Sequence, residues 1–203
     1  MITDNFPNVT GHVTLELKKD GKVVETVKGK NIWTNTGRQF LADLIRYDVY
    51  VDPTNPGTST PKRVDRVAYF GLGSGSQIAS VDITSLVSPV SFDAYPPAGG
   101  GDRFLAYIQS SSQSNEPDYT GVTFEREFSV NELVDSSGNP IILTEIGLYT
   151  DGDQLNDFAV GIESINGINS NTPGFAPIAY KTFEPITKTT DYVLRITWQV
   201  RFS

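Results

Sequence analysis

Residues 192–202, YVLRITWQVRF, show the most regular pattern in the chain. Every second residue is apolar or aromatic, and the residues between them are polar except Val193. This period of two predicts a β-strand with one buried face, because neighbouring side chains of a strand point to opposite sides. The buried face comprises Tyr192, Leu194, Ile196, Trp198, Val200 and Phe202. Such a strand is stable only inside a packed sheet, since ordering its backbone costs about as much free energy as burying its side chains gains.

A similar alternation near the start of the chain predicts a β-hairpin over about residues 10–28. Val13, Leu15 and Leu17 alternate with polar residues up to Lys18. Asp20-Gly21 follows, and this pair readily adopts the positive backbone angles of a tight hairpin turn. Residues 23–27 then form the returning strand.

One short helix is predicted over about residues 36–46. Thr36 with Gln39 three residues later fits a capping box, in which each side chain satisfies a free backbone donor. The apolar stripe at helical spacing comprises Phe40, Leu41, Leu44 and Ile45. We expect this stripe to lie on a sheet or a sheet edge, while Arg38, Asp43 and Arg46 face water.

The remaining segments read as further strands separated by turns and polar loops. Strands are expected over residues 64–72, 103–109, 122–130, 141–149, 158–165 and 178–183. The polar run at residues 110–117 is expected to be an exposed loop tip. Short strands with frequent turn signals and one brief helix predict an all-β protein. The expected architecture is a jelly-roll-like β-sandwich with one short helix, formed as a single domain over residues 1–203.

Composition excludes several classes of function. The chain has 203 residues and a net charge of -8, which disfavours non-specific binding to nucleic acid. Cysteine is absent, so disulfides, thiolate zinc sites and a cysteine nucleophile are all excluded. No apolar run is long enough for a membrane helix. The N-terminal residues lack the pattern of a signal peptide, so we expect synthesis in a cytoplasm without export by that route.

Candidate catalytic and cofactor sites are weak. His12 is the only histidine, and it falls on the polar side of a strand with no nucleophile or acid spaced nearby, so we expect an exposed strand residue. The glycine-rich run at residues 71–75 lacks the lysine of a phosphate-binding loop, and we expect a sharp turn with unusual backbone angles instead. We therefore predict no catalytic residue and no cofactor.

Three aspartates in one short segment form a candidate calcium site. They are Asp151, Asp153 and Asp157. Calcium binds several oxygen ligands in such loops, but the spacing does not fit the twelve-residue loop of helix-loop-helix calcium sites. A solvated hairpin turn is the simpler interpretation.

Four residues are predicted to contact other molecules. Arg126 interrupts the apolar face of the strand at residues 122–130, which suggests a sheet edge or a contact with another subunit. Tyr95, Asp102 and Tyr119 lie in or beside polar loops that are suited to contact or display.

The order of several motifs resembles that of a known group of proteins. NIWTNTGR at residues 31–38 leads into the helix, VAYFGLGSG occupies residues 67–75, and TEIGLY occupies residues 144–149. The chain then has AYKTF at residues 179–183, PITKT at 185–189 and LRITWQVRF at 194–202. This order, from about Lys28 to Ser203, resembles small structural proteins of tailed bacteriophage virions, including capsid decoration proteins and tail or collar fibre domains. The resemblance implies no cofactor, no catalytic residue and repeated copies on a symmetric particle.

The first hypothesis is a capsid decoration, or cement, protein that bridges neighbouring capsid subunits on the outside of the shell. Its partners would be the major capsid protein or other virion proteins, and its copies would meet as a dimer or trimer. Neither nucleic acid nor membrane is an expected partner. The alternative is a tail, collar or baseplate component of the same kind of particle. A third alternative is a carbohydrate-binding β-sandwich that stacks sugars on Tyr47, Tyr50, Tyr95 and Tyr119.

Overall fold

The computed structural model describes residues 9–45, 49–51, 59–61, 67–90, 105–113, 121–135, 137–150 and 176–202. The single helix of this part is α1 (Asn35–Ile45). The strands are β1 (Val9–Lys19), β2 (Lys22–Lys30), β3 (Ile32–Trp33), β4 (Val49–Val51), β5 (Ser59–Pro61), β6 (Val67–Gly73), β7 (Leu105–Tyr107), β8 (Ser110–Gln113), β9 (Gly121–Phe128), β10 (Ile141–Thr150), β11 (Ala179–Lys188) and β12 (Val193–Phe202).

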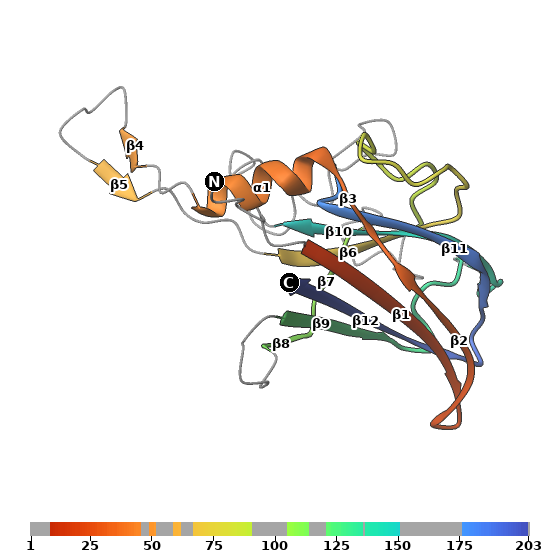
Figure 1. Ribbon diagram of the computed structural model, residues 1–203. Helices are drawn as coiled ribbons and strands as arrows, with labels where there is room; N and C mark the ends of the chain where they lie inside the picture. The colour runs from red at the N-terminus through yellow and green to blue at the C-terminus, as the bar shows by residue number, and fades with distance from the viewer. Residues whose placement is uncertain are drawn as a thin grey trace.

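The strands form two antiparallel sheets of five strands each. Sheet A has the order β2-β1-β12-β9-β8, and sheet B has the order β3-β11-β10-β6-β7. β4 and β5 make a separate two-stranded ribbon that projects from the rest, at the upper left of Figure 1. The prediction of an all-β protein with one short helix is therefore confirmed.

One apolar cluster fills the space between the two sheets. From sheet A it takes the inner faces of β1, β12 and β9, and from sheet B those of β6, β10 and β11. Trp198 of β12 is fully buried and stacks on Phe70 of β6, with ring centroids 6.3 Å apart. The two layers are held together by the burial of apolar side chains that alternate along each strand.

The strand that was most regular in sequence lies at the centre of sheet A. β12 pairs with β1 on one side and with β9 on the other. Its predicted inner face is buried at Leu194, Ile196, Trp198 and Val200, and the flanking Tyr192 and Phe202 are half-buried. A strand with neighbours on both edges satisfies all its backbone hydrogen bonds, which fits its central place.

The predicted hairpin is formed by β1 and β2. Asp20 and Gly21 make the turn with φ angles of 51° and 74°, as expected for the primed turns that match the twist of paired strands. Val13, Leu15 and Leu17 are buried, as the alternation predicts. The hairpin tip projects at the lower right of Figure 1.

The strand β2 continues almost directly into β3 and so passes from sheet A to sheet B. Asn31 lies between the two strands, and its N–H donates to the carbonyl oxygen of Gly11 at 3.0 Å. β3 then pairs with β11 through Ile32 and Trp33. This crossing, the orange ribbon that rises to β3 and α1 in Figure 1, ties the two sheets together along one side.

The helix begins differently from the prediction. Its N-cap is Thr34, whose hydroxyl oxygen accepts a hydrogen bond from the N–H of Gly37 at 3.1 Å. The same hydroxyl donates to the carbonyl oxygen of Pro177 at 2.5 Å. The predicted capping box of Thr36 and Gln39 is wrong, because the buried Thr34 caps the helix and anchors it to the chain before β11. Phe40 packs against the core and Arg38 is exposed, as expected.

Three other local predictions need correction. The first part of the polar run at residues 110–117 is not a loop, because Ser110–Gln113 forms β8 and pairs with β9. The run at residues 71–75 does not use unusual backbone angles, since its glycines have no positive φ. The strand predicted at residues 178–183 is longer, because β11 extends to Lys188. The strand predicted at residues 158–165 lies outside the described residues.

Candidate functional site

The most unusual polar group in the described residues is the carboxylate of Glu145. Glu145 is completely buried. Oε1 accepts hydrogen bonds from the backbone N–H groups of Gly75 at 3.1 Å, Val87 at 3.0 Å and Ser88 at 2.9 Å. Oε2 accepts from the hydroxyl of Tyr180 at 2.7 Å. Four donors therefore compensate the cost of removing this carboxylate from water.

A β-bulge brings Glu145 to this position. The pairing of β10 with β11 shifts register between Leu143 and Glu145. Leu143 belongs to the core between the sheets, whereas Tyr149, on the same face as Glu145, belongs to a second cluster on the outer face of sheet B. The bulge therefore turns a side chain outward that simple alternation would place inward.

Residues 74–90 fold over this outer face, and we call them the strap. The strap contributes Ile83 and Leu86 to the second apolar cluster, where they meet Leu105, Tyr149 and Tyr180 of sheet B. In Figure 1 it is the yellow-green trace that follows β6. Because Glu145 receives hydrogen bonds from both ends of the strap, it fixes this segment to the sheet.

Two facing glycines make room for the ring of Tyr149. Gly71 of β6 and Gly147 of β10 are opposite each other in the sheet. A Cβ atom would lie 2.8 Å from Cε2 of Tyr149 at Gly71, and 2.7 Å from the same atom at Gly147. These glycines therefore serve close packing and not a turn, which explains why their backbone angles are ordinary.

The tyrosines beside Glu145 stay protonated. Burial, and then the hydrogen bond to Glu145, raise the pKa of Tyr180 well above its ordinary value. Burial and the charge of Glu145 likewise raise the pKa of Tyr149. Both hydroxyls are thus neutral at physiological pH, and the hydroxyl of Tyr180 is a permanent donor to the carboxylate. The arrangement is suited to holding structure together, since the carboxylate's donors all belong to the chain itself.

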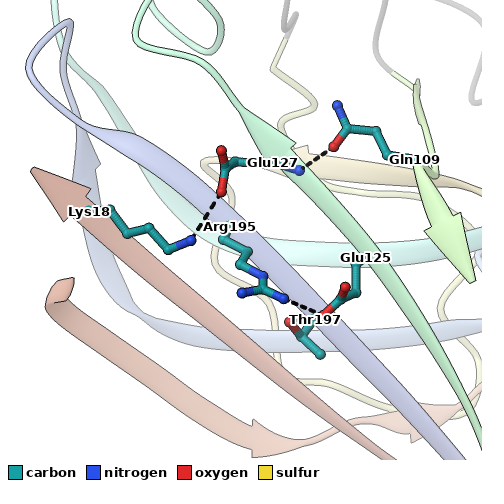
Figure 2. Close-up of polar contacts among 6 residues, drawn as sticks. All are labelled: Lys18, Gln109, Glu125, Glu127, Arg195 and Thr197. Atoms are coloured by element: carbon teal, nitrogen blue, oxygen red, sulfur yellow. Dashed lines mark hydrogen bonds and ion pairs between the residues drawn. The ribbon is translucent and has the colours of Figure 1, made fainter. Parts of the chain in front are cut away.

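The outer face of sheet A has a different character, with ion pairs across its strands (Figure 2). Lys18 of β1 pairs with Glu127 of β9 at 3.0 Å, and Arg195 of β12 pairs with Glu125 of β9 at 2.7 Å. The hydrogen bond and the charge of Glu125 raise the pKa of Arg195 further. The backbone N–H of Glu127 also donates to Oε1 of Gln109 at 2.8 Å. Because these ion pairs are partly exposed to solvent, they contribute little to the stability of the fold.

Arg126, predicted as an edge or subunit contact, is held by its own chain. It lies on β9, next to the edge strand β8. Its guanidinium donates to the carbonyl oxygen of Tyr107 at 2.7 Å and pairs with Glu132 at 2.9 Å. It also lies over the ring of Phe128, 4.6 Å from the centroid. A contact of Arg126 with another subunit stays a prediction.

His12 is exposed, as expected. It lies on the outer face of β1, opposite Gln199 of β12 and Lys30 of β2. The residues described contain no group of three or more histidine, aspartate and glutamate side chains that could hold a metal ion.

The other predicted site residues lie outside the described residues or on a strand described by its backbone. Tyr47, Tyr95, Asp102 and Tyr119 lie outside the described residues, as do the calcium candidates Asp151, Asp153 and Asp157. Tyr50 belongs to β4, a strand described through its backbone alone.

A buried lysine was not anticipated from the sequence. Lys188, the last residue of β11, is fully buried, and its Nζ donates to the carbonyl oxygens of Thr189 at 2.9 Å and Val130 at 3.3 Å. Burial lowers its pKa from 10.5 to about 8, and the charge of Glu132 opposes this shift. The sequence pattern does not indicate this burial, because a lysine at a strand end is ordinarily exposed.

Three of the six motifs on which the predicted resemblance depends meet around Glu145. The run at residues 71–75 supplies Gly75, the TEIGLY motif contains Glu145 and Tyr149, and AYKTF contains Tyr180. NIWTNTGR supplies Thr34, which anchors the helix just before β11. Among the described helices none is long and apolar enough to cross a membrane. Comparison with protein-family models, with curated proteins and with solved structures finds no significant match.

Proposed function

We propose that this chain is a non-enzymatic structural protein of a tailed bacteriophage virion, and specifically a capsid decoration protein that bridges capsid subunits. The observation that carries the proposal is the convergence of three of the six motifs, at residues 67–75, 144–149 and 179–183, on the Glu145 anchor. These motifs, together with Thr34, hold the strap and α1 onto sheet B. Contacts that fix a strap and a helix to a sheet suit a protein that works through the shape of its surface.

The connections between the sheets support a jelly-roll-like β-sandwich. β9 and β12 are paired in sheet A, and the strands that follow and precede them, β10 and β11, are paired in sheet B. The two pairs together behave as one antiparallel ribbon that folds from one layer to the other. A ribbon that folds over in this way is the element from which jelly rolls are built.

A decoration protein acts by adding contact area across the joints of a shell. A stable interface buries about 1,200–2,000 Å² in total, and a partner that binds only the assembled shell shifts the equilibrium towards assembly by mass action. Copies of the chain would repeat with the symmetry of the particle, with a dimer or trimer as the expected unit. The residues predicted for such contacts remain Arg126, Tyr95, Asp102 and Tyr119.

The test is to find the protein in purified particles from the bacterium that produces it. Mass spectrometry of the particles should detect the chain in many copies, and cryo-electron microscopy should show it on the outer shell. A few copies on the tail, collar or baseplate would replace the decoration proposal with the alternative location. Absence from the particles would reject both.

A second measurement examines the stabilising role directly. Particles assembled without the protein should release their contents at lower temperature, and added purified protein should restore the original temperature. Unchanged release temperatures would rule out a cementing role.

The absence of catalysis has its own check. His12→Ala removes the only side chain of its type in the chain. If an activity were found in the wild type and lost in this variant while the fold was kept, the non-enzymatic proposal would be wrong.

A further inference from the structure

One corner of the outer face of sheet A carries a group of exposed cationic side chains. Lys28 and Lys30 of β2 stand opposite Thr14 and His12 of β1. Arg201 of β12 stands opposite Thr10, one position further along the same face. Cross-strand neighbours are about 5 Å apart and diagonal neighbours about 7–8 Å apart, so these side chains share one surface. Lys28, Lys30, Arg201 and His12 are all exposed, and we call this group the basic corner.

One carboxylate of this face, that of Glu16 on β1, lies diagonal to Lys28, but it stands opposite Arg195 of β12, whose pKa its charge helps to raise. The carboxylates of Glu125 and Glu127 lie on the same sheet, but they are engaged by Arg195 and Lys18. No ion pair is formed by Lys28, Lys30 or Arg201 with any described residue. The charges of this face are thus separated into a paired region and an unpaired cationic region.

A further lysine approaches the same edge of β2 from the inner face, because Gly29 and Lys181 stand opposite the core residues Val13 and Ile146. Lys181 of β11 lies against Gly29, the residue between Lys28 and Lys30, and a Cβ at Gly29 would be 3.0 Å from its Nζ. Glycine at this position therefore lets the Lys181 amine approach the edge of β2. On the outer face, the exposed cations of the basic corner repel one another, and an anionic partner would relieve that repulsion.

We propose that the basic corner is the docking surface for an acidic segment of another virion protein. The inference rests on the proposed function, which places the chain against other proteins, and it adds the face used and the chemistry of the partner. The whole chain carries a net charge of -8, so a long polyanion would be repelled by the rest of the molecule, whereas a short acidic segment can contact the basic corner alone. Carboxylates spaced along a protein surface can meet the separate lysine and arginine side chains one by one, which fits an open sheet face.

The test compares a variant in which three charges of the basic corner are reversed with a control variant that has the same net charge. The corner variant is Lys28→Glu, Lys30→Glu and Arg201→Glu. The control variant is Lys19→Glu, Lys22→Glu and Arg38→Glu, which reverses the same number of charges at the hairpin tip and on α1. Circular dichroism and thermal melting of both variants establish that the fold is kept.

The probe is a fluorescent oligoglutamate peptide of about 12 residues, titrated at low ionic strength where exposed charges are little screened. The corner variant should bind it roughly 10- to 30-fold more weakly than the wild type, since three exposed cations no longer pair with the peptide and the reversed charges repel it. The control variant, whose net charge changes equally, should bind the peptide with an affinity within about threefold of that of the wild type. Equal losses in both variants would show a net-charge effect and overturn the inference.

Two further outcomes would also overturn it. One is an oligophosphate of matched charge that binds at least as tightly as the peptide and depends on the same three residues. The other is self-association in sedimentation that only the corner variant loses, which would make a second copy the partner. Particle incorporation distinguishes this inference from the proposed function. Wild-type protein found in particles, with the corner variant incorporated equally well, leaves the function standing and rejects the docking surface.

Discussion

Replacing Glu145 by alanine should destabilise the protein by about 4 kcal/mol, because buried donors lose their acceptor. The N–H of Gly75 and the hydroxyl of Tyr180 are shielded from water, and an unsatisfied buried donor costs about 1–3 kcal/mol each. Val87 and Ser88 are exposed, so their N–H groups can turn to water and add little to the loss. In a chain of this size the change corresponds to a fall in Tm of about 8–16 °C.

Glutamine at position 145 keeps the size of the side chain and one hydrogen-bonding oxygen, but it removes the negative charge. Glu145→Gln keeps one oxygen for the strap N–H groups, and the Tyr180 hydroxyl can rotate to accept from the new amide. The expected loss is about 1–2 kcal/mol, from the exchange of charge-assisted bonds for neutral ones. The order of stability should be wild type, then glutamine, then alanine.

The assay is urea unfolding combined with hydrogen exchange at the strap amides. Glu184→Ala is the matched control, because Glu184 is an exposed glutamate on the neighbouring strand β11, and it should change stability by less than about 0.5 kcal/mol. The amides of Gly75 and Ser88 should lose protection in Glu145→Ala before the core strands do. A Glu145→Ala protein as stable as the control, with strap amides still protected, would refute the assignment of Glu145 as an anchor.

Three further predictions concern Lys188, Gly147 and the helix cap. The folded-state pKa of Lys188, about 8, is below its unfolded value of 10.5, so the unfolded chain binds more protons between these pH values and the free energy of unfolding should rise with pH there. Lys188→Met should remove a rise of about 2 kcal/mol between about pH 7.5 and 9.5, measured by urea titration. A parallel pH dependence of variant and wild type would contradict this. Gly147→Ala should cost about 1–3 kcal/mol in thermal unfolding, because the new Cβ would lie 2.7 Å from Cε2 of Tyr149, and a neutral effect would mean that the ring has room to move. Thr34→Ala should cost about 1–2 kcal/mol and Thr36→Ala less than about 0.5 kcal/mol, whereas the reverse order would restore the cap predicted from sequence.

Much of the fold was predictable where the pattern is local. The hairpin follows from alternation on either side of Asp20-Gly21, a turn whose chemistry resides in two residues. The β12 strand follows from alternation over eleven residues, which no helix would show. The sheet partners were not predictable in the same way, because pairing depends on contacts between residues far apart in sequence.

The Glu145 anchor could not be predicted for two physical reasons. A bulge changes the phase of β10 at this point, so the alternation of the sequence gives the wrong face. Three of its four donors are backbone N–H groups of the strap, and every residue type except proline offers that same group. The helix cap was misplaced for a related reason, since both Thr34 and Thr36 have the right chemistry and only the burial of Thr34 against Pro177 decides between them.

The pairing of β1 with β12 has a consequence for how the chain is made. Val9 lies beside Phe202 and Lys18 beside Val193, so β1 reaches its partner only after the long segment between β1 and β12 has been synthesised. Until then the β1–β2 hairpin exposes Val13, Leu15 and Leu17 together with an open strand edge, which is a template for aggregation. Contacts between such distant segments also slow folding. The yield of native protein should therefore depend on how long the nascent chain is protected, through slow synthesis at low temperature or through chaperones, as much as on the stability of the finished fold.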